Sequence, residues 1–151
     1  MPTAPKILLI VEDQLLLAMG LKDELEDGGY RVLELAVRHQ EALAFARAVK
    51  PDLALVNIEL AHGDDGVALA RDLKAIGVPV LFISGQPDRA RLEKAVAIAS
   101  LAKPYSSADM LQAVDYLFRH ALGDESRPGP SRLEMLDAAV ADPRSGGAPP
   151  P

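Results

Sequence analysis

Apolar residues gather in five short runs along the chain, each four to seven residues long. The runs cover residues 6–11, 30–36, 53–56, 78–83 and 98–102. Three of them are almost continuous in apolar residues, which is typical of strands that are buried on both faces of a parallel sheet. The pattern therefore predicts five short β-strands.

Between and after these runs, apolar residues recur at the three- and four-residue spacing of an amphipathic helix. The positions are Leu17, Leu21 and Leu25; Ala42, Leu43, Ala46 and Val49; Leu69, Leu73 and Ile76; Leu92, Ala95 and Val96; and Met110, Leu111, Val114, Leu117 and Phe118. Glycines at 28–29 and at 77 are expected to end the first and third helices. Ser106 or Ser107 is expected to cap the fifth.

Strict alternation of strand and helix predicts an α/β fold of the (βα)5 type. Right-handed crossovers place the helices on both faces of one parallel sheet. We expect a flavodoxin-like doubly wound sheet with strand order 2-1-3-4-5. In such a sheet the functional site lies beyond the carboxyl ends of the strands.

The composition changes after residue 121. We expect one domain over residues 1–121, followed by a flexible tail over 122–151, which holds six prolines and four glycines. Within the tail, Ser131 and Glu134 have the spacing of a capping box, and a short helix over 131–142 is predicted. An isolated helix of this length is marginal in water.

Charge and composition narrow the classes of function. The net charge is −6 and the pI is about 5.0, which argues against non-specific binding to nucleic acid or to anionic membranes. Cysteine is absent, so disulfides, zinc–thiolate sites and cysteine nucleophiles are excluded. The first apolar run is too short for a signal peptide or a membrane span. A cytoplasmic protein is expected.

Polar residues stand just past the end of four predicted strands. They are Glu12 and Asp13 after the first, Asn57 after the third, Ser84 after the fourth and Lys103 after the fifth. Taken singly, each is a plausible helix cap, turn or solvated loop residue. Together they bring two carboxylates, an amide, a hydroxyl and an ammonium to one rim, which suits Mg²⁺ and a phosphoryl group.

The chain resembles the receiver domain of two-component response regulators over residues 6–121. The stretches that carry the resemblance are "LLIVEDQ", "PDLALVNIEL", "PVLFISG" and "LAKPY". The family is a signalling family, so the resemblance implies a CheY-like protein in a phosphorelay, not an enzyme.

The resemblance also implies roles for the rim residues. Glu12 and Asp13 would bind Mg²⁺ together with the side chain at position 57, and the backbone carbonyl of Glu59 would complete the metal shell. Ser84 and Lys103 would contact a phosphoryl group. The peptide bond before Pro104 would be cis.

Three positions depart from the family's pattern. Asn57 stands where the family carries the aspartate that accepts the phosphoryl group. Ser100 stands where a switch aromatic is usual. Ala61 stands where proline is common, in a loop that is one residue longer. The longer loop weakens the match of Asp65-Gly66 to the "DG" that follows the third strand in the family.

These features lead to one main hypothesis about function. The chain is expected to bind a histidine kinase, a phosphotransfer protein or a downstream target, without orthodox phosphorylation at Asn57. A homodimer through the face of the fourth helix, fifth strand and fifth helix is expected, Mg²⁺ binding is expected to be weak, and nucleic acid and membranes are not expected partners.

Two other hypotheses stay open. One is a phosphorylatable regulator, either with Asn57 substituted for the acceptor or with Glu59, Asp64 or Asp65 used instead. The other is a small Mg²⁺-dependent phosphatase-like enzyme. Phosphatases that use aspartate carry a D-x-D pattern after the first strand, and "VEDQ" lacks it.

Overall fold

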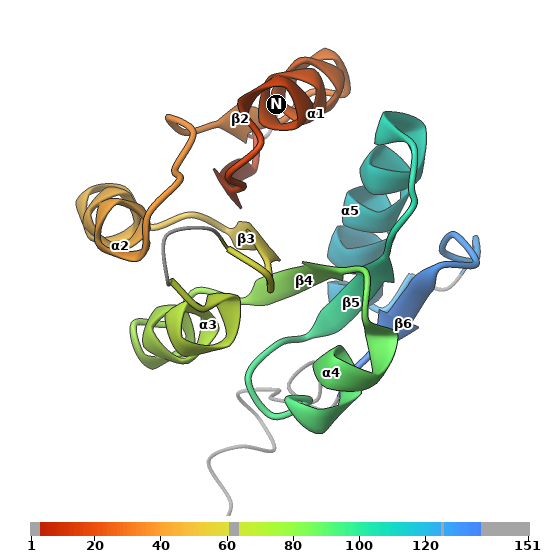
Figure 1. Ribbon diagram of the computed structural model, residues 1–151. Helices are drawn as coiled ribbons and strands as arrows, with labels where there is room; N and C mark the ends of the chain where they lie inside the picture. The colour runs from red at the N-terminus through yellow and green to blue at the C-terminus, as the bar shows by residue number, and fades with distance from the viewer. Residues whose placement is uncertain (1–3, 61–63, 125, 137–151) are drawn as a thin grey trace, which may run out of the picture.

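One six-stranded sheet forms the centre of the molecule. The computed structural model describes residues 4–60, 64–124 and 126–136. The strand order is β2-β1-β3-β4-β5-β6; the first five strands run parallel and β6 runs antiparallel to β5 (Figure 1). The strands are β1 (Ile7–Val11), β2 (Arg31–Val32), β3 (Leu53–Asn57), β4 (Val80–Ser84), β5 (Ala99–Ala102) and β6 (Leu133–Met135). The predicted doubly wound sheet and its order 2-1-3-4-5 are confirmed, with one strand added.

Helices cover both faces of this sheet. They are α1 (Leu15–Asp27), α2 (His39–Ala48), α3 (Gly66–Ala75), α4 (Pro87–Leu92) and α5 (Ser107–Ala121). Residues of α1 and α5 share one core cluster with the sheet, and residues of α2, α3 and α4 share the other (Figure 1). Within the described ranges, no helix is long and apolar enough to cross a membrane.

The central strands are buried along almost their whole length. Every residue of β3 and β4 is buried, as the continuous apolar runs predicted. The register pairs Val11 with Val56, Asn57 with Ile83, and Ser84 with Ala102. These pairs bring the carboxyl ends of neighbouring strands to the same rim, where the predicted site lies.

Local signals fix the helix ends. Ser106 caps α5 in a capping box, because its hydroxyl accepts from the Asp109 amide and the Asp109 carboxylate accepts from the Ser106 amide. At the end of α3, Gly77 has a φ of 84° and Val78 donates back to Leu73, which is a Schellman motif. Both predicted helix ends are therefore confirmed.

The fourth helix is shorter than its apolar spacing predicted. It ends at Leu92, so Ala95 and Val96 lie outside it. Of its residues only Ala90 is buried, and Leu92 is 83% exposed. A helix that buries so little apolar surface gains little from further turns.

The helix predicted over 131–142 is wrong for its described part, because residues 133–135 form β6. Glu134 does not close a capping box; its carboxylate accepts hydrogen bonds from Arg91 on α4 instead. Pairing with β5 satisfies backbone groups that a short isolated helix would hold only marginally. Residues 137–142 lie outside the described residues. The sheet thus continues beyond the expected domain boundary at residue 121.

Candidate functional site

The rim beyond the carboxyl ends of the strands brings four predicted residues into contact. Asn57, the last residue of β3, donates from Nδ2 to Glu12 Oε2 at 3.2 Å and to Asp13 Oδ1 at 3.4 Å. Lys103, just after β5, donates from Nζ to Asn57 Oδ1 at 3.4 Å. The amide is therefore the centre of the cluster, with its donor end toward the carboxylates and its acceptor end toward the lysine.

Backbone geometry supports this orientation of the amide. The Glu59 amide donates to Asn57 Oδ1 at 3.3 Å, a short-range turn typical of asparagine. Asn57 is only 2% exposed, so its polar atoms need protein partners. Two carboxylates, one lysine and one backbone amide supply them.

The two neighbouring carboxyls hold protons very differently. Burial, and secondly a hydrogen bond with Asp13, raises the pKa of Glu12, which is 1% exposed. The same hydrogen bond from Glu12 lowers the pKa of Asp13. Glu12 Oε2 accepts from the Gln14 amide at 3.1 Å, whereas Oε1 has no hydrogen-bond partner among the described residues. Burial thus disfavours the charged form of Glu12 more than that of Asp13.

Ser84 lies at the same rim but contacts a different carboxylate. Its hydroxyl oxygen lies 3.1 Å from Glu59 Oε1 and 3.1 Å from the Gln86 carbonyl oxygen, both acceptors for its single proton. The Gln86 amide donates to Ser84 Oγ at 2.8 Å. Glu59 was expected to give its backbone carbonyl to the metal shell or to serve as an alternative acceptor. Its side-chain contact with Ser84, and any role of Gln86, were not predicted. The Ser-Gly turn was the available signal for Gln86, because serine commonly bonds the amide two residues on.

A glycine allows the chain to pass close behind Asn57. A Cβ added to Gly66, the first residue of α3, would lie 2.3 Å from the Asn57 carbonyl oxygen and 2.6 Å from Ile58 Cα. The Gly66 amide donates to the Ile58 carbonyl at 3.0 Å. The start of α3 is thus packed against the strand end that carries the site.

The other acidic residues near this strand end are engaged elsewhere. Asp64 pairs with Arg38 at 2.8 Å, and this hydrogen bond lowers the pKa of Asp64. Asp65 caps α3 by accepting from the Val67 amide at 3.0 Å and also pairs with Arg89 at 3.0 Å. Neither carboxylate is directed at Asn57 by these contacts. Ala61 lies outside the described residues.

Tyr105 is a partly buried neighbour of the site that was not singled out from the sequence. Burial, and secondly the charge of Glu12, raises its pKa to about 12. Its hydroxyl has no hydrogen-bond partner within the described part of the chain. The preceding Lys103–Pro104 peptide bond is cis, as the resemblance implied. The "LAKPY" stretch itself was the signal that could have drawn attention to this tyrosine.

The donor set fits a weakly held divalent cation. The unpartnered Oε1 of buried Glu12 favours a cation there. Against tight binding, the nitrogen end of the Asn57 amide faces both carboxylates, and Lys103 supplies positive charge nearby. Among residues 4–60, 64–124 and 126–136, no group of three or more His, Cys, Asp or Glu is placed to hold a metal ion. Mg²⁺ is usually held by one or two carboxylates together with phosphate oxygens and waters.

The fold and the rim define a CheY-like α/β domain whose polar residues gather at the strand ends. The chain belongs to the response regulator receiver domain family, which it matches over residues 8–115. It is 30% identical over 115 residues to the transcriptional regulatory protein PdtaR of Mycobacterium tuberculosis, covering 74% of this chain and 56% of PdtaR. It is 37% identical over 106 residues to the phyllosphere-induced regulator PhyR of Methylorubrum extorquens, covering 68% of this chain and 40% of PhyR.

Solved structures agree with this assignment. A CheY-like receiver domain protein from Methanospirillum hungatei superimposes with a TM-score of 0.68 at 25% identity, covering 77% of this chain and 95% of that chain. The chain spans about half the length of the curated relatives it matches. The family match and the solved structure agree that this chain contains a response regulator receiver domain of two-component signalling.

Proposed function

We propose that this chain is a receiver-type signalling protein that acts by binding a protein partner and takes no phosphoryl group at Asn57. The main support for this proposal is the Asn57 amide, which is buried at the end of β3 and hydrogen-bonded to the carboxylates of Glu12 and Asp13. In receiver domains an aspartate at this position forms an acyl phosphate.

The chemistry of an amide supports this proposal. The nitrogen lone pair of Asn57 is delocalised into the carbonyl group, and the carbonyl oxygen is a weak nucleophile. The lysine at the rim already lies within hydrogen-bond reach of the amide oxygen, 3.4 Å away. The rim is thus held together by its own side chains and needs no phosphoryl group to pair its lysine.

Mg²⁺ has a limited place in this proposal. Glu12 and Asp13 would hold it, with the backbone carbonyl of Glu59 as a neutral ligand. The side-chain oxygen of Asn57 would join them only after the amide turns, because its nitrogen faces both carboxylates. When bound, the cation would supply positive charge to the rim. We propose weak binding, because only two of these ligands carry a formal charge. The affinity of a hard cation decreases when its ligands carry less negative charge.

The partner class follows from the family. A histidine kinase, a phosphotransfer protein or a downstream target protein would bind the receiver surface. The homodimer expected through α4, β5 and α5 stays a prediction; the outer edge of β5 on that face pairs with β6 in the structure. This is a binding role, and the enzyme hypothesis gains nothing from a match to a signalling family.

One observation favours a second candidate, phosphorylation of Glu59. Its carboxylate lies 3.1 Å from the Ser84 hydroxyl, the group that the resemblance assigns to a phosphoryl oxygen. Asp64 and Asp65 have other partners, so Glu59 is the better placed of the three neighbouring carboxylates.

The two candidates are separated by one experiment. The native chain, Asn57→Asp, and Glu59→Gln are incubated with acetyl phosphate and Mg²⁺, and intact mass is followed by peptide mapping. We expect the native chain to stay unmodified and Asn57→Asp to gain one phosphate on residue 57. Asn57→Asp is the positive control for the remaining rim residues.

Two results would change this conclusion. A phosphate on native Glu59 that Glu59→Gln abolishes would establish the second candidate. A phosphate that maps to residue 57 of the native chain, without deamidation of Asn57, would overturn the first.

A further inference from the structure

The outer edge of β5 is closed by a segment of the same chain. Leu136 donates its amide to the Ile98 carbonyl at 2.9 Å, and Ala102 donates its amide to the Arg132 carbonyl at 3.2 Å. Without β6, β5 would be the last strand of the sheet. An unpaired edge strand is a template for another extended chain, which is how many domains bind peptides.

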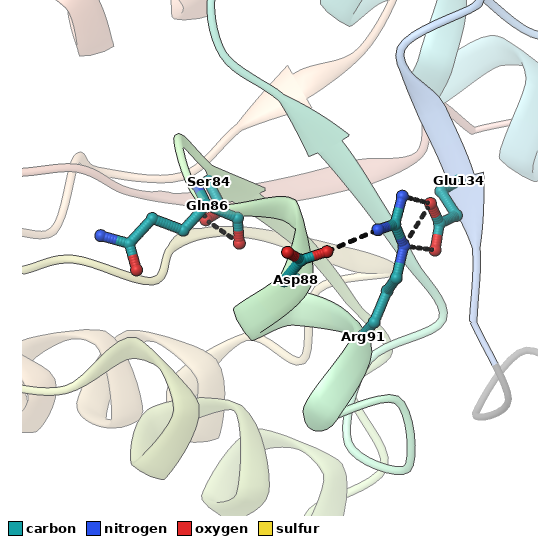
Figure 2. A network of polar contacts seen from close by, with 5 residues as sticks. All are labelled: Ser84, Gln86, Asp88, Arg91 and Glu134. Atoms are coloured by element: carbon teal, nitrogen blue, oxygen red, sulfur yellow. Dashed lines mark hydrogen bonds and ion pairs between the residues drawn. The ribbon is translucent and has the colours of Figure 1, made fainter.

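Side chains of β6 alternate between the two faces of the sheet. Leu133 and Met135 pack against the core cluster that contains α5. Glu134 points the other way, toward Arg91 on α4 (Figure 2). Arg91 donates from Nε to both Glu134 oxygens at 2.9 and 2.8 Å, and from Nη2 to Oε1 at 2.8 Å. The edge therefore accommodates an apolar residue, a glutamate and a second apolar residue in that order.

A small residue on β5 makes room for this contact. Ser100 is the direct partner of Glu134 in the β5–β6 register and is 5% exposed. Directly paired residues share one face of a sheet, so Ser100 and Glu134 lie side by side on the same face. An aromatic ring at position 100 would compete with the glutamate for this space. Ser100, which stands where the family usually has an aromatic residue, therefore leaves room for a glutamate on the strand that pairs with β5.

The strand β6 is short, and its ion pair with α4 is exposed. The strand has only three residues, and the side chains of Arg91 and Glu134 are 53% and 40% exposed. Exposed ion pairs are screened by salt and contribute little stability. Short peripheral elements open more readily than core strands. The segment that fills this edge is therefore one that a competing segment can replace.

We propose that the outer edge of β5, together with Arg91, is a docking site for an extended partner segment that carries a glutamate between two apolar residues. β6 is the intramolecular occupant that such a partner displaces. The inference deepens the proposed role in partner binding and rests on it. A different protein is the favoured partner over a second copy, because β6 of a second copy competes against an identical segment that is tethered at higher effective concentration.

The proposal is tested on the full chain with a fluorescent peptide, SRLEML, which is the sequence of residues 131–136. Glu134→Lys should release β6 from Arg91 and leave the edge intact. We expect this variant to bind the peptide at least about tenfold more tightly than the native chain does, because the tethered competitor is weakened. Ser100→Tyr, made in the Glu134→Lys background, should abolish this binding.

Charge reversal tests the recognition itself. Arg91→Glu should lose SRLEML and instead bind SRLKML. Arg71→Glu is the matched control. Arg71 lies on α3 and forms an exposed ion pair with Glu93, so this variant makes the same charge change away from β6. Thermal unfolding of each variant checks that it is folded.

Several outcomes would overturn the proposal. One is that the native chain and Glu134→Lys bind the peptide with equal affinity, and another is that the affinity does not change when Arg91 is replaced. A native dimer that exchanges β6 between copies would overturn it as well. Because the measurement needs no phosphoryl transfer, its failure leaves the proposal about Asn57 standing.

Discussion

Two glutamates of this molecule, one at the rim and one at the outer edge of the sheet, behave in opposite ways. Glu12 is 1% exposed and has an oxygen without a hydrogen-bond partner among the described residues, and burial raises its pKa. Glu134 is partly exposed and accepts three hydrogen bonds from one guanidinium, which lower its pKa. The residue type is the same, and the surroundings reverse the preference for the charged form.

This contrast separates a built-in polar site from a replaceable contact. At the rim, charge is confined between buried strands, so changing one group disturbs all its neighbours. At the edge, water competes with every contact, so the ion pair selects a register more than it adds stability. A short path links the regions: Ser84 bonds Gln86, and α4, which starts at the next residue, carries Arg91 (Figure 2).

The largest expected effect concerns the backbone of the rim. Gly66→Ala should lower the free energy of unfolding by roughly 2–4 kcal/mol, because its Cβ would overlap backbone atoms that cannot rotate away. Gly20→Ala is the control, since a Cβ there meets nothing within 4 Å. Because position 20 is exposed and helical, Gly20→Ala should raise the free energy of unfolding by about 0.5–1 kcal/mol. Urea unfolding of both measures the difference, and equal effects would refute close packing behind Asn57.

Asn57→Asp should have the next largest effect. A third carboxylate, buried like that of Glu12, replaces an amide that donates to the other two. The free energy of unfolding of the metal-free variant should therefore fall by roughly 1–3 kcal/mol. Mg²⁺ should restore this loss and bind the variant more tightly than it binds the native chain. Unfolding with and without Mg²⁺ measures both effects. Equal Mg²⁺ affinity of the two proteins would show that the charge argument is wrong.

Glu12→Gln should change the pH dependence of stability. Because the pKa of Glu12 is raised in the folded state, its favourable contribution is present below the unfolded pKa and is lost as pH rises through the folded pKa. The glutamine variant stays neutral. In metal-free buffer, the difference in free energy of unfolding between this variant and the native chain should therefore grow in favour of the variant from pH 4 to pH 8. Each unit of pKa difference corresponds to about 1.4 kcal/mol. A constant difference across this range would contradict the assigned direction.

Glu134→Gln should show the opposite sign and the smallest effect. Its pKa is lowered, chiefly by the hydrogen bonds from Arg91, so its contribution is present above the unfolded pKa and is lost as pH falls through the folded pKa. Asp88 also pairs with Arg91, and Lys94 lines the same hollow. Amide exchange at Leu136 should be faster in the variant at pH 7 and equal to native at pH 3. Faster exchange at both pH values would point to packing instead of charge.

The elements that follow from local pattern were predicted well. Continuous apolar runs identified β1, β3 and β4, because strands buried on both faces must be apolar throughout. Helix ends were predicted from Gly77 and Ser106, whose roles depend only on groups within a few residues along the chain. By contrast, α4 and β6 were mispredicted, because their extent depends on contacts with residues far along the chain.

The site divides in the same way. The positions of Glu12, Asp13, Asn57 and Lys103 followed from the rule that strand ends share one rim, and the structure brings these side chains together. Which end of the Asn57 amide faces the carboxylates could not be read from sequence, because it depends on three strands at once. The contact of Ser84 with Glu59 was missed for the same reason.

The apolar pattern of the sequence was enough to predict the five parallel strands, the positions of the helices and the place of the rim, because alternation and periodicity encode what each segment buries. The lack of a carboxylate at position 57 is read directly from the sequence. Only the tertiary structure decided how charge is distributed between Glu12 and Asp13, and that the capping-box pattern at 131–134 yields to strand pairing with β5. Both depend on free energies of burial and of long-range hydrogen bonding. Those energies exist only once distant segments of the chain are packed together.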